Sequence, residues 1–247
     1  MPAALTPLID MAFPPRCPLC GDPLSEQGGL CPACWQRLAI PGEPACGLCQ
    51  RPLGDTGAGS AGPLVCAPCL AEKPRHDGIT AATLYTDASR SLVLALKHGR
   101  RISLAGLLGR LVAARLTGLE GEWLAIPVPL HRWRLWHRGF NQSALIAREV
   151  ANSARARLVV DGLLRPRATP ALGGFGRAER ARVLKGSIVA NPRRAQDLHD
   201  SRVLLVDDVM TSGATTDACI AALRKAGVRE VRIACFARVL DEALPHV

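Results

Sequence analysis

Four Cys-x-x-Cys pairs within the first 70 residues constrain the fold of this chain more than any other feature. The pairs are Cys17/Cys20, Cys31/Cys34, Cys46/Cys49 and Cys66/Cys69. Two intervening residues let both thiolates of a pair face one ion, and two pairs complete a tetrahedral four-cysteine site. A segment this short cannot build an adequate apolar core, so metal has to hold it together. The spacing therefore predicts two structural zinc sites in a double zinc ribbon.

Disulfides and a redox dithiol are the alternatives to zinc. Disulfides need an oxidising compartment, and a redox dithiol normally occurs once, beside a strand–helix–strand pattern. The start of the chain, MPAALTPLIDMAFPPRC, lacks the basic n-region and long apolar core of a signal peptide, and residues 5–13 fit a short helix instead. No apolar run approaches the length of a membrane span, so we expect a cytoplasmic protein.

The order of the cysteines favours sequential grouping, with the first four on one ion and the next four on another. An interleaved arrangement stays open at this stage. Cys219 and Cys235 lie outside the pairs in apolar surroundings and are predicted to be small buried side chains. Residues 54–63 resemble a Gly/Ser loop within the second ribbon.

The positive charge of the chain is confined to its C-terminal part. The whole chain carries 31 basic and 21 acidic side chains, and residues 1–75 contain five basic and six acidic ones. Residues 76–247 therefore hold 26 basic against 15 acidic side chains, a balance of +11. Such a field favours an anionic ligand there, although a coding bias towards arginine contributes to the composition.

Residues 76–247 alternate between strand and helix patterns and form the second of two predicted domains, after a ribbon domain at 1–75. Strands are predicted at 79–85, 124–128, 203–206 and 231–239, and helices at 89–98, 103–117, 141–157 and 215–226. This order is typical of an α/β fold with a parallel sheet flanked by helices.

The stretch VLLVDDVMTSGATT, residues 203–216, carries the strongest functional signal. Ligands of parallel α/β folds lie beyond the carboxyl ends of the strands, where Asp207 and Asp208 are expected. The turn that follows opens a helix, whose backbone N–H groups and dipole favour an anion. The carboxylates can accept hydrogen bonds from hydroxyl groups, and the turn can donate to a phosphate. Together they suit a ribose 5-phosphate. The donors come from Thr211, Ser212, Gly213, Ala214 and Thr215.

Two other interpretations of this stretch are open. A Walker B strand also ends in paired acids, but it needs a phosphate loop with a Gly-Lys pair, which the chain lacks. Alternatively, the aspartates only cap the following helix.

The same stretch resembles the signature of type I phosphoribosyltransferases. In that family the two acids bind the ribose hydroxyls of phosphoribosyl pyrophosphate (PRPP), the turn binds its 5-phosphate, and Mg²⁺ is bound mainly through the pyrophosphate. Upstream, AIPVPLHRWRLWHRGFNQ resembles a segment of the ComF family of competence proteins, which includes the GntX group. The resemblance covers nearly the whole chain and implies a phosphoribosyltransferase-like fold.

The resemblance implies further contacts to the phosphates of PRPP. The segment around Val128 and Pro129 is placed like a pyrophosphate loop, and guanidinium groups match phosphate oxygens. The basic candidates are Lys97, Arg132, Arg134, Arg138 and Arg180. Residues 165–185 correspond to a mobile hood, with two departures from the family. Ala171–Gly173 stand where a Gln follows Thr-Pro, and Val183 stands where an Asn follows Glu-Arg.

Three functions are compatible with these residues. The first is a PRPP-binding, phosphoribosyltransferase-like enzyme linked by resemblance to DNA uptake and to the proteins of the competence machinery, with no acceptor identified. The second is an adaptor that binds single-stranded nucleic acid through Trp133, Trp136 and the neighbouring arginines, without transfer. That segment is also compatible with a plain solvated face. The third is a PRPP-sensing regulator.

Overall fold

The computed structural model describes residues 13–54, 64–99, 101–169 and 177–240, of which the side chains at 177, 178, 180 and 181 are not described. The helix expected at 5–13 and the Gly/Ser loop at 54–63 fall almost entirely outside these ranges. No helix in the described ranges combines the length and the apolar character needed to cross a bilayer.

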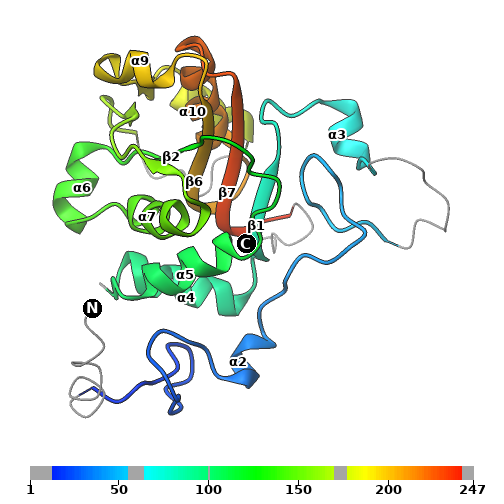
Figure 1. The fold of residues 1–247 in the computed structure, drawn as a ribbon, viewed down its shortest axis with the longest axis vertical. Helices are drawn as coiled ribbons and strands as arrows, with labels where there is room; N and C mark the ends of the chain where they lie inside the picture. The colour runs from blue at the N-terminus through cyan, green and yellow to red at the C-terminus, as the bar shows by residue number, and fades with distance from the viewer. Residues whose placement is uncertain (1–12, 55–63, 100, 170–176, 241–247) are drawn as a thin grey trace.

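A five-stranded parallel sheet forms the centre of the molecule, with the strand order β1-β7-β6-β2-β3 (Figure 1). Its strands are β1 Ile79–Leu84, β7 Glu230–Arg238, β6 Arg202–Met210, β2 Leu124–Pro127 and β3 Arg157–Leu158. A separate antiparallel pair joins β4 Leu163–Leu164 to β5 Val189–Ala190. The parallel α/β fold expected from the sequence is confirmed.

Helices cover both faces of the sheet. One face packs against α4 Asp87–Lys97, α5 Leu104–Ala113 and α7 Gln142–Ala154, and α5 lies beside α7 (Figure 1). The other face packs against α10 Ala214–Lys225 and the β4–β5 pair, with α8 Arg177–Leu184 against α10. The remaining helices are α2 Pro32–Trp35, α3 Ala67–Ala71, α6 Arg132–Arg138, α9 Ala195–Leu198 and the 3₁₀ turn η2 Pro192–Arg194.

Several expected boundaries needed correction. The strand predicted at 203–206 continues to Met210, so both aspartates lie within β6 and not after it. The helix predicted at 141–157 ends at Ala154, because Arg155 adopts a left-handed conformation and Arg157 starts β3. The segment HRWRLWHR, for which no helix was predicted, forms α6.

Alternation along β6 divides its side chains between the two faces of the sheet. Leu205 packs with α10 and β4, whereas Leu204 and Val206 pack with α4, α5 and α7. The same alternation assigns Asp207 to the α10 face and Asp208 to the α4 face. Two adjacent acids in the sequence therefore meet different neighbours.

The cysteine-rich segment contacts the sheet domain at two separate places. The part with α2 and the part with α3 lie on different sides of the sheet in Figure 1. Arg110 of α5 donates to the carbonyl oxygen of Gly28 at 2.8 Å, which attaches the first part. The cysteines of the second part belong to the same apolar cluster as the sheet and α10.

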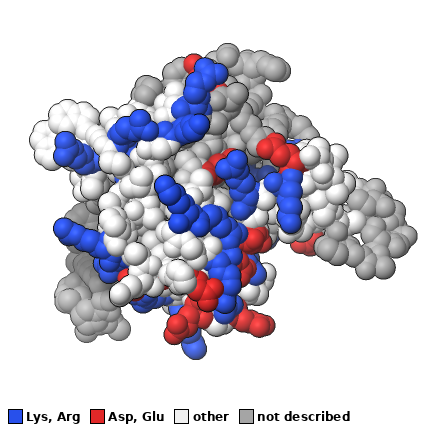
Figure 2. Space-filling model, turned by 90° about the horizontal axis from the view of Figure 1, so that it is seen from above, with Lys and Arg blue, Asp and Glu red and all other residues white. Residues whose placement is uncertain are grey.

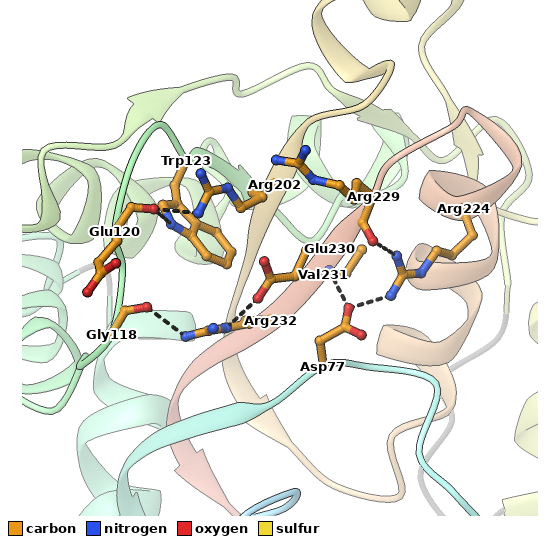
Figure 3. Close-up of polar contacts among 10 residues, drawn as sticks. All are labelled: Asp77, Gly118, Glu120, Trp123, Arg202, Arg224, Arg229, Glu230, Val231 and Arg232. Carbon is orange, nitrogen blue, oxygen red and sulfur yellow. Dashed lines mark hydrogen bonds and ion pairs between the residues drawn. The ribbon is translucent and has the colours of Figure 1, made fainter.

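Arginines at the amino ends of the strands are already compensated. Arg224 bridges to Asp77, and Arg232 donates to Glu230 at 2.8 Å (Figure 3). Arg202 lies over the ring of Trp123 and donates to a backbone carbonyl. Figure 2, the view from above, shows acidic side chains interspersed among the basic ones. The charge pattern therefore gives this edge little capacity for another anion.

Candidate functional site

Asp207 and Asp208 lie near the carboxyl end of β6, with 9% and 3% of their surface exposed. The Ser143 hydroxyl donates to Oδ1 of Asp207 at 2.9 Å, and the backbone N–H of Asp208 donates to the same oxygen. Burial, and then the charge of Asp208, raise the pKa of Asp207 to about 7, against the opposing effects of Lys97 and Ser143. The protonated form of Asp207 is therefore favoured far more than that of an exposed aspartate.

Lys97 provides the countercharge for Asp208. Its Nζ lies 2.6 Å from Oδ2 of Asp208, at the C-terminal end of α4. The other oxygen of Asp208 accepts the backbone N–H of Val209 at 2.9 Å. Lys97, predicted from the sequence to contact phosphate, thus already neutralises one member of the pair.

The turn after β6 leads directly into α10. Gly213 adopts φ +79° and precedes α10, and a Cβ there would come within 3.2 Å of Met210. Its carbonyl oxygen accepts from the Thr216 hydroxyl at 2.7 Å, which stabilises the start of the helix. Ala214 is buried, Ser212 and Thr215 are partly exposed, and Thr211 is exposed. The five predicted turn residues thus connect the end of β6 to the start of α10.

The segment after β2 borders the same edge of the sheet. The backbone N–H of Val128 donates to the Val206 carbonyl at 2.9 Å, and Asn141 donates to the Val128 carbonyl at 3.0 Å. Pro129 is buried beside it. The predicted pyrophosphate loop therefore lies one strand away from the carboxylates.

A basic cleft of about 540 Å³ opens next to Lys97. Helix α6 and the end of α4 line it with Lys97, His98, Trp133, Arg134, His137 and Arg138. Arg132 points elsewhere, being exposed and absent from this lining. The side chain of Arg180, the last basic candidate, is outside the described part of the chain. Two of the four arginine candidates therefore share the cleft with Lys97.

Three polar residues at this site were not predicted from the sequence. Ser143 binds Asp207, Gln142 accepts from Arg138 at 2.7 Å, and Arg165 is buried on the α10 face. The first two follow Asn141, whose side chain caps α7 by accepting the Ser143 N–H at 3.0 Å. The sequence does carry a signal for them, because an asparagine at the N-cap marks the start of a helix. The polar residues that follow it then belong to the first helical turn, which lies at the sheet edge.

The eight paired cysteines form two compact groups. Cys17, Cys20, Cys31 and Cys34 make one, and Cys46, Cys49, Cys66 and Cys69 make the other, with all sulfur atoms of a group within 4.8 Å of one another. A tetrahedral ion with zinc–sulfur bonds of about 2.3 Å separates its sulfurs by about 3.8 Å. Both groups fit zinc, and the sequential grouping of the cysteines is confirmed.

Backbone N–H groups favour the thiolate at the first cysteine of each group. Burial opposes ionisation of Cys17, but N–H groups of Cys31, Cys20 and Leu19 outweigh it and lower its pKa to about 6. Cys46 has the same arrangement and also a pKa of about 6. Cys219 and Cys235 are fully buried outside both groups, as predicted, and burial raises their pKa values.

Comparison with known families agrees with both parts of the structure. A double zinc ribbon domain matches residues 8–70, and a phosphoribosyl transferase domain matches residues 176–247. The chain is thus of the class that joins a double zinc ribbon to a phosphoribosyltransferase fold.

Curated relatives cover both parts together. DNA utilization protein YhgH of Salmonella typhi is 31% identical over 241 residues, covering 93% of this chain and 100% of the relative. The Escherichia coli O6:H1 (strain CFT073) protein of that name is 30% identical over 237 residues, with the same coverage. Competence protein F of Haemophilus influenzae is 28% identical over 230 residues, covering 90% and 96%. This chain belongs to the family of these proteins, as the resemblance in its sequence indicated.

Proposed function

We propose that this protein binds PRPP with Mg²⁺ and acts as a phosphoribosyltransferase-like protein in the utilization of incoming DNA. The observation that carries the proposal is the buried carboxylate pair on β6, followed directly by the donor turn at the start of α10. The names of the relatives, a DNA utilization protein and a competence protein, support the link to DNA. The proposal places the protein in the cytoplasm, where thiolates stay reduced for zinc.

Each part of the site has a task in this proposal. Asp207 and Asp208 accept hydrogen bonds from the two ribose hydroxyls, and Thr211–Thr215 donate to the 5-phosphate. The cations of the cleft stabilise the pyrophosphate, which leaves with the electron pair of its bond to the sugar, and Val128 and Pro129 border it. Mg²⁺, held mainly through the pyrophosphate, would add a positive charge to this leaving group.

Calorimetry with PRPP and Mg²⁺ tests the proposal. Wild-type protein should bind, and the Asp207→Asn/Asp208→Asn double variant, which keeps the shapes of the side chains, should lose most of the affinity. Glu122→Gln, which removes an exposed carboxylate away from the site, is the matched control and should bind normally. Absence of binding by the wild type would refute the proposal.

A second candidate function is binding of single-stranded nucleic acid by α6. Trp133 and Trp136 stack with ring centroids 5.2 Å apart and an interplanar angle of 17°, while 65% and 74% of their surfaces stay exposed. Exposed aromatic rings beside arginines are typical of surfaces on which bases stack. In this second candidate function, the single-stranded nucleic acid binds at the mouth of the same basic cleft.

Fluorescence anisotropy with a labelled single-stranded oligonucleotide tests this candidate. Stacking contributes about 1–3 kcal/mol per base, so Trp133→Ala/Trp136→Ala should weaken binding roughly tenfold or more. Trp35→Ala removes an exposed tryptophan from α2 and should have no effect. Affinity should fall steeply with salt, because phosphate contacts release counterions. Equal affinities of wild type and the double tryptophan variant would exclude this surface.

A further inference from the structure

A groove of about 1130 Å³ runs along α10 and shares no lining residue with the basic cleft beside Lys97. Its other walls are β5 with the end of α8, and the linker between α3 and β1. Pockets for drug-sized ligands are commonly about 300–1,000 Å³, so this groove has room for a segment of polypeptide.

The floor of the groove is apolar and consists of short side chains. Alanines at 214, 218, 222 and 226 follow one another at intervals of four residues and therefore lie on one side of α10. Ile188 and Val189 line the groove beside them, and Val189 keeps 40% of its surface exposed. The distance between packed helices depends on the side chains at their contact, so this floor lets a second helix approach α10 closely.

Four exposed cations border the floor. They are Arg75 in the linker, Arg182 and Lys185 at the end of α8, and Lys225 at the end of α10. Within the described ranges none of the four forms an ion pair. Glu72 and Asp217 also line the groove, and four cations against two acids leave a balance of +2. The groove therefore offers countercharge to an anionic occupant.

The lining of the groove suits a protein helix better than a nucleic acid. Single strands stack their bases on aromatic rings, and the described residues that line the groove include no aromatic one. A nucleic acid also carries a charge at every nucleotide, which Glu72 and Asp217 would repel. A helix can place acids beside the cations and neutral residues opposite these two carboxylates, while its apolar face covers the floor.

We propose that this groove is a docking site for an acidic amphipathic helix of a partner protein. The helix lies along α10, with apolar side chains on the alanine floor and carboxylates beside Lys185 and Lys225. The proposal goes beyond the binding of PRPP and does not depend on it, because the cations that it uses lie outside the cleft beside Lys97.

Fluorescence anisotropy of the full chain with a labelled synthetic peptide tests the docking site. The probe has 12 residues, the length of α10, with leucine and alanine on one face and glutamate on both flanks. A covalent staple keeps it helical, since isolated helices this short are marginal in water. A second stapled peptide carries lysine in place of every glutamate. Wild type should bind the glutamate peptide roughly tenfold more tightly, because like charges meet in the other complex.

Charge reversal at the rim separates this site from a general effect of net charge. Lys185→Glu/Lys225→Glu should prefer the lysine peptide, and such a gain of binding cannot arise from unfolding. Arg90→Glu/Arg148→Glu changes the net charge equally at exposed positions of α4 and α7, on the opposite face of the sheet, and should keep the preference of wild type. Equal effects of the two double variants would overturn the proposal.

The floor and the competing ligand are tested in the same assay. Ala221→Trp places a large ring in the groove at an exposed position of α10, and it should weaken binding of the glutamate peptide without lowering Tm. Failure of wild type to bind the glutamate peptide, or equal affinity for both peptides, refutes the docking site. Displacement of the bound peptide by a single-stranded oligonucleotide would assign the groove to nucleic acid and also refute it.

Discussion

The stability of Asp207→Asn relative to wild type should increase as the pH rises. The carboxyl group is fully buried, and its pKa rises from an ordinary 3.8 to about 7, first because of burial and then because of Asp208. Below pH 3.8 the raised pKa does not change the free energy of unfolding, because Asp207 is protonated in both the folded and unfolded states. As the pH rises, the free energy of unfolding falls, and the loss is complete above pH 7.

The size of the effect follows from this difference in pKa. At 1.36 kcal/mol per pKa unit, ionised Asp207 lowers the free energy of unfolding by about 4 kcal/mol at pH 8 and by about 2 kcal/mol at pH 5.5. An asparagine carries no such charge, but leaving its buried amide N–H group unpaired costs about 1–3 kcal/mol. The stability difference between variant and wild type should therefore shift by about 2 kcal/mol in favour of the variant between pH 5.5 and 8.

Urea unfolding of Asp207→Asn and wild type, side by side at each pH, measures this difference. Any pH-dependent loss of zinc affects both proteins and cancels in the comparison. Glu122→Gln serves as a control for the loss of one carboxylate. A stability difference that stays constant from pH 5.5 to 8 would show that Asp207 is not held in the environment described above. The variant should also lose PRPP affinity, since the carboxylate is retained for its ligand at the expense of stability.

Three further predictions follow from the packing and the protonation state. PRPP binding should release protons near pH 7, because ribose hydroxyls favour the ionised form of Asp207, whose pKa is raised to about 7; calorimetry in buffers of different ionisation enthalpy measures this, and equal binding enthalpies in all buffers would contradict it. Cys20→Ala, in the group with the exposed thiol, should leave the thermal unfolding of the sheet domain nearly unchanged, whereas Cys49→Ala, in the group within the main core, should lower its Tm. Gly109→Ala should destabilise the protein by about 1–3 kcal/mol in urea unfolding, since the new Cβ would overlap with Glu149 and separate α5 from α7.

Residues whose local pattern matches their final environment could be predicted from the sequence. The apolar run 203–206 indicated a strand buried on both faces, and these residues are fully buried in β6. Gly227, with φ +86°, ends α10 as its position after the helix predicted. The cysteine spacing predicted the four pairs, and the favoured sequential grouping is confirmed, although only the structure excludes the interleaved one. These features depend on neighbours within a few residues.

Features that depend on contacts between distant elements could not be predicted. Helix α6 has no buried residue, so no apolar periodicity marks it. Ser143 lies 64 residues from Asp207 in the sequence, and only the packing of α7 against β2 and β6 brings them together. Arg165 looked like one more cation in a basic segment, and nothing in that local pattern indicated that it is buried.

The geometry of a single strand makes the two aspartates unequal. Asp208 meets Lys97 from α4, whereas Asp207 accepts from the hydroxyl of Ser143 at the start of α7 and lies in the field of Arg165. A neutralised Asp208 needs no cation from a ligand. Burial and the charge of Asp208 raise the pKa of Asp207 towards neutrality, so under the proposed function Asp207 is the member whose protonation a ligand would change. Both carboxylates lie within a buried strand, and that strand leads directly into the turn at Gly213.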